Sequence, residues 1–155
     1  MRKRILEKIN FPGRKAFISI GIVIIVLLAA FFVVNLIEGD ETVEFRVLMD
    51  SEIPQEITSQ VIPEYRNLER ALACKVGDRV YVMVSRGEKP TSGFDVDIDR
   101  MVLEDRNGNR NLVVFAIFRD PQPGVALSQV LTYPLRIAET SLTELPDQIE
   151  LRVQF

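Results

Sequence analysis

The chain has 155 residues and a net charge of −3, and it contains no His, no Trp and a single cysteine, Cys74. The lack of His excludes a Ser–His–Asp triad and any metal site that needs an imidazole ligand. One cysteine can form neither an internal disulfide nor a zinc site built from cysteines. The length suits one domain with an appendage. The composition therefore argues against most familiar enzyme classes and favours a binding module.

Residues 16–37 form a run of 22 residues without a charge, AFISIGIVIIVLLAAFFVVNLI. An α-helix of this length is about 33 Å long, which is enough to cross the hydrocarbon core of a bilayer. A helix buried in a globular domain would show a polar face, and this run has none. We therefore expect a transmembrane helix over residues 16–37.

The charges on either side of this run predict its orientation. Residues 1–15 carry six basic residues and one acidic residue, whereas residues 38–155 carry 13 basic and 21 acidic residues. Basic flanks stay in the cytoplasm, so we expect a cytoplasmic tail over 1–15 and an extracytoplasmic domain over 38–155. The run is longer than the apolar region of a signal peptide and no A-x-A pattern follows it, which favours an uncleaved signal-anchor over a cleaved signal peptide.

Two further observations bear on the partners and source of the outer domain. Its excess of acidic residues argues against nucleic-acid binding, which needs a basic surface. The chain also contains no Asn-x-Ser/Thr sequence, which mildly favours a bacterial protein at the cell membrane. We expect no cofactor, no metal and no small-molecule substrate.

The outer domain contains short segments, some alternating between apolar and polar residues and some continuously apolar, bounded by turn residues. These patterns predict strands over 43–49, 69–76, 79–85, 94–103, 111–118, 130–139 and 148–155. A four-residue apolar spacing predicts one short helix over 51–62, which Pro63 should end. Gly77-Asp78 and Asn107-Gly108 predict two hairpin turns. The expected fold is mainly β, an antiparallel sheet or sandwich of six to seven strands with one short helix, preceded by the transmembrane helix.

Two groups of side chains suggest chemistry but have simpler explanations. Asp95, Asp97 and Asp99 share one strand face, but alternate residues of a strand lie about 6.6 Å apart, too far for one calcium ion. We interpret them as a solvated face that protects the sheet. Cys74 has neither a His nor a second cysteine as partner, so we interpret it as a small, partly buried apolar residue.

The strongest functional candidate is the loop from Gly87 to Phe94, which joins two apolar strands. The loop reads Gly87, Glu88, Lys89, Pro90, Thr91, Ser92, Gly93 and Phe94. The two glycines permit sharp turns, and the proline restricts both itself and the preceding lysine. Such a pre-organised loop on a sheet is suited to binding another protein, although an ordinary long hairpin connection explains the same residues.

Three short motifs in this half of the chain resemble the C-terminal domain of the protease-complex subunit PrcB family. They are the loop G-E-K-P-T-S-G-F from Gly87 to Phe94, the P-Q-P-G turn from Pro121 to Gly124, and T-Y-P from Thr132 to Pro134. The resemblance covers residues 80–155. Ser92 replaces a glycine of the family pattern and Phe94 replaces a tyrosine. The resemblance implies an accessory subunit that associates with a surface protease and helps it mature or remain stable.

The resemblance directs our functional hypothesis to a protein partner. We expect an accessory or chaperone subunit of a secreted or surface protease, with Gly87–Phe94 as the contact and with Tyr133 and Pro134 shaping the adjoining surface. As an alternative, the sequence PTSGF is similar to a loop of chagasin-type protease inhibitors, although that family's Arg-Pro-Trp loop has no counterpart here. An enzyme working through carboxylates or a lone Ser or Lys is the third hypothesis.

Overall fold

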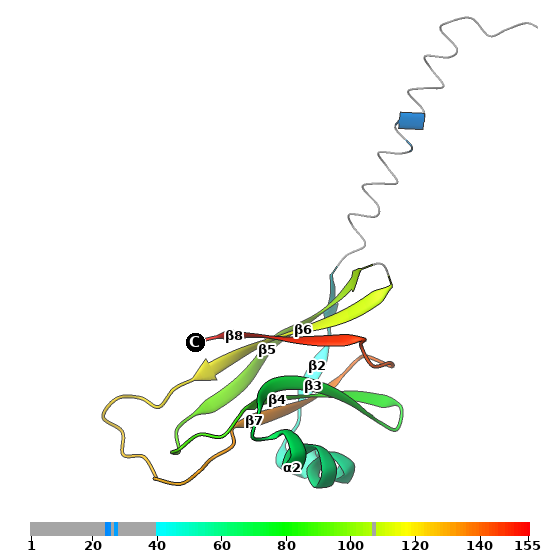
Figure 1. Cartoon of the computed structure of the whole chain (residues 1–155). Coiled ribbons are helices and arrows are strands. Elements are labelled where there is room, and N and C mark those ends of the chain that lie inside the picture. Colours follow the sequence, from blue (N-terminus) through cyan, green and yellow to red (C-terminus); the bar gives the residue numbers. More distant parts are fainter. Residues whose placement is uncertain (1–23, 26, 28–39, 107) are drawn as a thin grey trace, which may run out of the picture. The chain divides into compact units, whose positions relative to one another are not determined.

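The computed structural model describes residues 24, 25, 27, 40–106 and 108–155, of which residues 40–155 form one compact unit. Eight strands of this unit form two four-stranded sheets that pack face to face (Figure 1). The first sheet has the order β1-β5-β6-β8 and the second has the order β2-β7-β4-β3. The strands are β1 (Glu41–Val43), β2 (Phe45–Val47), β3 (Glu69–Val76), β4 (Arg79–Arg86), β5 (Asp95–Arg106), β6 (Asn109–Arg119), β7 (Leu135–Thr140) and β8 (Gln148–Gln154).

Two apolar clusters hold this unit together. The larger lies between the sheets and draws residues from both, among them Val82, Val84, Val96, Met101, Leu112, Val114 and Ala138. The smaller lies on the outer face of the second sheet, where Leu72, Met83 and Ile137 pack under Ile57 of the helical segment. The predicted mainly β fold with one short helix is confirmed.

The helical segment differs from the prediction in its length. A 3-10 turn, η1 (Asp50–Glu52), precedes a π-helical turn, η2 (Ile57–Val61), which continues into α2 (Ile62–Tyr65). The expectation that Pro63 ends the helix is wrong, because the helix runs on to Tyr65. The widened π-helical turn, in which the Ile62 N–H bonds to the Ile57 carbonyl, lies directly before the proline and gives its ring room against the preceding turn.

The strand predicted over 43–49 is divided between the two sheets. Val43 lies opposite Met101 of β5 in the first sheet, whereas Phe45 lies opposite Thr140 of β7 in the second. The chain therefore crosses from one sheet to the other at Glu44, which connects the sheets along this side of the sandwich. Alternation alone predicts one continuous strand and carries no information about such a crossing.

Both predicted hairpins are present. β3 and β4 meet at Gly77, and β5 and β6 pair as far as Arg106 and Asn109, beside Gly108 with its positive φ. The regular alternation predicted over 94–103 is interrupted by a bulge between Ile98 and Arg100. The bulge shifts the inward positions from Val96 and Ile98 to Met101 and Leu103, and all four of these side chains are buried.

The last strand, β8, departs from the expected antiparallel arrangement. It pairs in parallel with β6, so the first sheet is mixed. The chain enters β8 beside the start of β6, where the Asp147 N–H donates to the Arg110 carbonyl (2.9 Å) and the Asp147 carboxylate accepts from the Arg110 N–H (2.8 Å). This reciprocal pair sets the register of the parallel pairing.

The predicted transmembrane segment 16–37 lies outside the described residues except for Ile24, Ile25 and Leu27, which are helical. In the part of the chain that the structure describes, no helix is long and apolar enough to cross a membrane.

Candidate functional site

The Gly87–Phe94 loop lies at one end of the sandwich beside a second, longer loop formed by residues 120–134 (Figure 1). Lys89 and Thr132 form an isolated antiparallel bridge, in which each N–H donates to the other residue's carbonyl at 2.9 Å. The Arg86 N–H also donates to the Pro134 carbonyl (2.9 Å). The loop predicted to bind a partner is therefore one half of a two-loop structure.

Two side chains add to the backbone contacts between these loops. The Thr132 hydroxyl donates to the Thr91 carbonyl (2.8 Å). The Ser92 N–H donates to the Ser128 carbonyl (3.0 Å), and the Ser92 hydroxyl accepts from the Ser128 N–H (2.9 Å). Ser92 thus uses its hydroxyl to hold the longer loop. Lys89, Thr91 and Ser92 are half-buried, whereas Glu88, Pro90 and Gly93 are exposed.

Gly87 and Gly93 are required by the geometry of the loop. Their φ angles are +74° and +92°, in the left-handed region that residues with a side chain rarely adopt. A Cβ on Gly87 would lie 3.1 Å from the Asn67 carbonyl oxygen, and one on Gly93 would lie 3.0 Å from the side chain of Leu127. Both ends of the loop are therefore fixed by tight backbone turns.

Arg86 anchors the base of both loops from inside the sandwich. Its side chain is only 4% exposed and lies between the rings of Phe94 and Phe118, with the guanidinium carbon 5.0 Å from each ring centroid. The guanidinium donates to the Arg119 carbonyl (2.6 Å) and to the carboxylate of Asp120, the first residue of the longer loop. One buried side chain thus contacts the end of the Gly87–Phe94 loop and the start of the longer loop.

Tyr133 joins the outer surfaces of the two loops. Its hydroxyl donates to the Glu88 carboxylate (2.9 Å), and this hydrogen bond raises the pKa of Tyr133 above its ordinary value. The Arg66 guanidinium lies over a face of the ring, 4.4 Å from the centroid. Tyr133, predicted as a neighbouring surface residue, therefore contacts the predicted loop directly, while the backbone of Pro134 bonds to Arg86.

The longer loop carries an apolar surface that the sequence reasoning missed. Val125, Val130 and Leu131 are 56%, 55% and 59% exposed. Residues 130–134 were expected to form the start of a strand, but β7 begins at Leu135. The signal was present in Pro134, because a proline cannot donate a hydrogen bond inside a sheet and commonly marks the start of a strand. We call Glu88, Pro90, Val125, Val130, Leu131 and Tyr133 the loop-end surface.

The other two candidate groups are the strand aspartates and Cys74. The carboxylates of Asp95 and Asp97 pair with the Arg119 guanidinium at 3.6 and 3.4 Å. Cys74 is half-buried as expected, and its burial raises the pKa of the thiol, which keeps the thiol protonated and unreactive. Among the described residues no group of three or more acidic or cysteine side chains could hold a metal ion.

A comparison with protein families matches residues 80–141 to the family described as PrcB C-terminal. The match confirms the resemblance seen in the sequence and contains the whole of both loops, but it ends before β8, so the resemblance is shorter than the range 80–155 predicted for it. The curated proteins and the solved structures contain no match to this chain.

Proposed function

We propose that residues 40–155 form a protein-binding module that acts as an accessory subunit of a secreted or surface protease. The match over residues 80–141 supports association with a protease complex. The observation that carries the site assignment is the loop-end surface, in which two loops of the matched segment are joined by backbone hydrogen bonds and the longer loop exposes apolar side chains.

The physical argument for binding rests on rigidity and exposure. The Gly87–Phe94 loop is held by the Lys89–Thr132 bridge and by buried Arg86, so it loses little conformational entropy when a partner binds. Val130 and Leu131 are held beside that bridge although they are more than half exposed. Exposed apolar side chains next to polar ones are a common feature of protein-contact surfaces.

The proposal is tested with residues 40–155 as bait on surface extracts of cells that produce the protein. We expect a protease or its precursor to be captured, and its capture to be lost when Leu131 is replaced by Asp. The matched control is Leu145→Asp, which places the same charge on another exposed leucine outside the two loops. Capture of no protease by the unaltered bait, or equal capture by both variants, contradicts the proposal.

An activity assay on the captured protease separates an accessory subunit from an inhibitor. An accessory subunit leaves the activity unchanged or prolongs it during storage. A chagasin-like inhibitor using the PTSGF sequence from Pro90 to Phe94 abolishes the activity at a stoichiometric ratio. Loss of activity in proportion to the added domain would replace the accessory role with the inhibitory one.

We further propose that residues 16–37 hold this module at the outer face of a cell membrane, with residues 1–15 in the cytoplasm. The uncharged run and its basic flank support this arrangement. In cell fractionation the full chain should remain with the membranes after a high-salt wash. External protease should digest residues 38–155 in intact cells. A mature chain that lacks residues 1–37 would instead identify a cleaved signal peptide.

A further inference from the structure

The strand β8 forms one border of its sheet. It pairs with β6 along one edge, and no strand of the described residues pairs with its other edge. β8 is seven residues long and contains neither a proline nor a bulge, two of the devices that protect a border strand from pairing with another chain. Its backbone is therefore available for further strand pairing.

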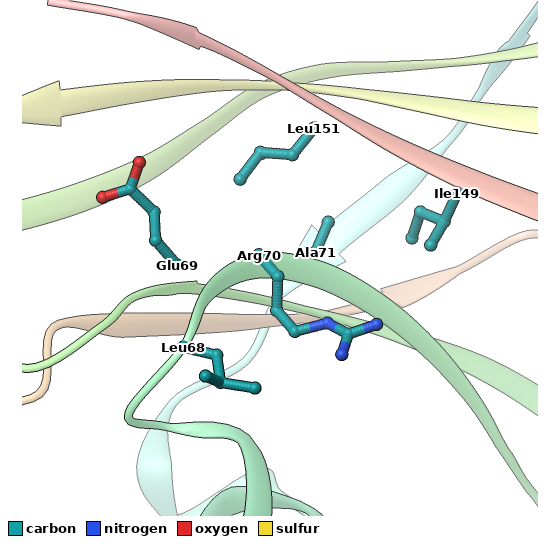
Figure 2. Close-up of a pocket in the computed structure, with 6 residues that line it drawn as sticks. All are labelled: Leu68, Glu69, Arg70, Ala71, Ile149 and Leu151. Carbon is teal, nitrogen blue, oxygen red and sulfur yellow. The ribbon is translucent and has the colours of Figure 1, made fainter.

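The side chains of β8 alternate between two environments. Ile149, Leu151 and Val153 are half-buried and pack against the core between the sheets, whereas Glu150 and Arg152 are exposed. Ile149 and Leu151 also line a cleft of about 450 Å³ whose other wall is the start of β3 (Figure 2). Apolar area thus remains open along the same border that offers the unpaired backbone.

The sequence of β8, Gln-Ile-Glu-Leu-Arg-Val-Gln, is complementary to itself when reversed. An antiparallel pair of two β8 strands centred on Leu151 places Ile149 opposite Val153 and Leu151 opposite Leu151. It also places each Glu150 opposite Arg152 of the other copy, so both cross-strand charge pairs are attractive. Within one chain the Arg152 guanidinium already donates to the Glu150 carboxylate (2.8 Å), and pairing would join two such ion pairs into a network of four charges.

We propose that β8 is a self-association edge, at which two copies of this chain pair antiparallel about Leu151 and join their first sheets into one eight-stranded sheet. The apolar side chains of the second copy would extend the half-buried face of β8 at the cleft. This edge lies outside residues 80–141, so the proposal does not depend on the proposed function.

Sedimentation of residues 40–155, which contain both apolar clusters, tests the association. Seven paired residues form a small interface, so we expect a dimer with a dissociation constant on the order of 10 μM. In a dimer of Glu150→Lys, the new lysine of each copy lies opposite Arg152 of the other copy, so both cross-strand pairs are repulsive. In a dimer of Arg152→Glu, the new glutamate lies opposite Glu150 and both pairs are again repulsive. Each variant alone should therefore remain monomeric, whereas an equimolar mixture of the two should form a heterodimer, because every cross-strand pair is then attractive.

The matched control is Glu56→Lys, which makes the same charge change at an exposed position of the helical segment and should leave the dimer intact. Thermal melting verifies that each variant is folded. A wild-type domain that stays monomeric at every concentration overturns the proposal, as does a Glu150→Lys variant that still dimerises or a mixture that fails to associate.

A cysteine pair tests the register without altering charge. The test uses a chain with Cys74→Ala and the double substitution Gln148→Cys and Gln154→Cys. In the proposed register the cysteine at position 148 of one copy lies opposite the cysteine at position 154 of the other. Oxidation should then give a disulfide-linked dimer. Either substitution alone should give none, because the two equivalent positions would be about 20 Å apart along the strands. Equal cross-linking of single and double variants would overturn the register.

Discussion

Lys89 and Thr132 exchange two backbone hydrogen bonds of 2.9 Å across 43 positions of the sequence. These bonds, together with the hydrogen bond from the Thr132 hydroxyl to the Thr91 carbonyl (2.8 Å), hold the predicted binding loop against the longer loop. The rigidity of the loop-end surface therefore depends on residues from both loops.

Replacing Thr132 by Val keeps the shape of the side chain and removes its hydroxyl. We expect the free energy of unfolding of residues 40–155 to fall by about 1 kcal/mol, the usual net value of one hydrogen bond. Urea denaturation measures this change. Thr143→Val, at an exposed threonine outside the two loops, is the control and should change stability little. Equal effects of the two substitutions would show that the hydroxyl of Thr132 contributes nothing to the contact.

Gly93→Ala should destabilise the domain more than Gly124→Ala. Both glycines have positive φ angles, +92° and +82°, so both substitutions carry a backbone strain of about 1–2 kcal/mol. Only at Gly93 would the new methyl group also crowd Leu127 and Pro121, at 3.0 and 3.1 Å, whereas nothing lies within 4 Å of it at Gly124. We expect an additional loss of about 1 kcal/mol for Gly93, measured by urea denaturation. Equal losses would mean that the longer loop moves aside without cost.

Arg86→Met tests whether the buried guanidinium anchors the two loops. The substitution keeps apolar bulk between Phe94 and Phe118 but removes the hydrogen bond to the Arg119 carbonyl (2.6 Å) and the contact with Asp120. We expect thermal denaturation to show a loss of about 1–3 kcal/mol, because the part-buried carbonyl loses a charged donor and Asp120 loses its ion pair.

The control for Arg86 is Arg79→Met at the other end of the same strand. Arg79 also pairs with a carboxylate, Glu139, but its side chain is 65% exposed, so its loss should cost less than about 1 kcal/mol. A methionine at position 86 that is tolerated as well as one at position 79 would contradict the anchoring role.

The strands, the hairpin turns and the Gly87–Phe94 loop could be predicted because each depends on residues that are neighbours in the sequence. The apolar runs of β4 and β6 and the glycines at 77 and 108 correctly identified two hairpins, because strand-forming composition and turn conformation are properties of neighbouring residues. The loop from Gly87 to Phe94 was found in the same way, from two glycines and a proline within eight residues.

The missed features depend on residues far apart in the sequence. The bulge at Asp99 shows in the sequence only because the spacing of the buried residues changes from two to three between Ile98 and Met101. The crossing of the chain between the sheets at Glu44 can be predicted only if the neighbouring strands are known. The parallel pairing of β8 follows from the contact between Asp147 and Arg110, 37 positions apart. For the same reason, the sequence predicted the Gly87–Phe94 part of the loop-end surface but not the apolar residues of the longer loop. The longer loop is brought to this surface by the bridge between Thr132 and Lys89.

The hydrogen bond from Tyr133 to Glu88 makes the loop contact sensitive to alkaline pH. Because this bond stabilises the protonated phenol, it raises the pKa of Tyr133 above the ordinary value of about 10. A raised pKa in the folded state means that the contact contributes stability below the ordinary pKa and loses it as the pH rises through the raised value. At higher pH the phenolate and the Glu88 carboxylate repel each other.

Carbon NMR of the tyrosine rings follows this titration residue by residue. Glu88→Gln should lower the pKa of Tyr133 toward its ordinary value, because the charged acceptor is gone. Glu64→Gln is a matched control, since Glu64 raises the pKa of Tyr65 by the same kind of hydrogen bond and lies outside the two loops. It should shift Tyr65 and leave Tyr133 unchanged. If Glu88→Gln leaves the pKa of Tyr133 unchanged, the two side chains do not contact each other in solution. The outer surfaces of the two loops would then not be joined by this hydrogen bond.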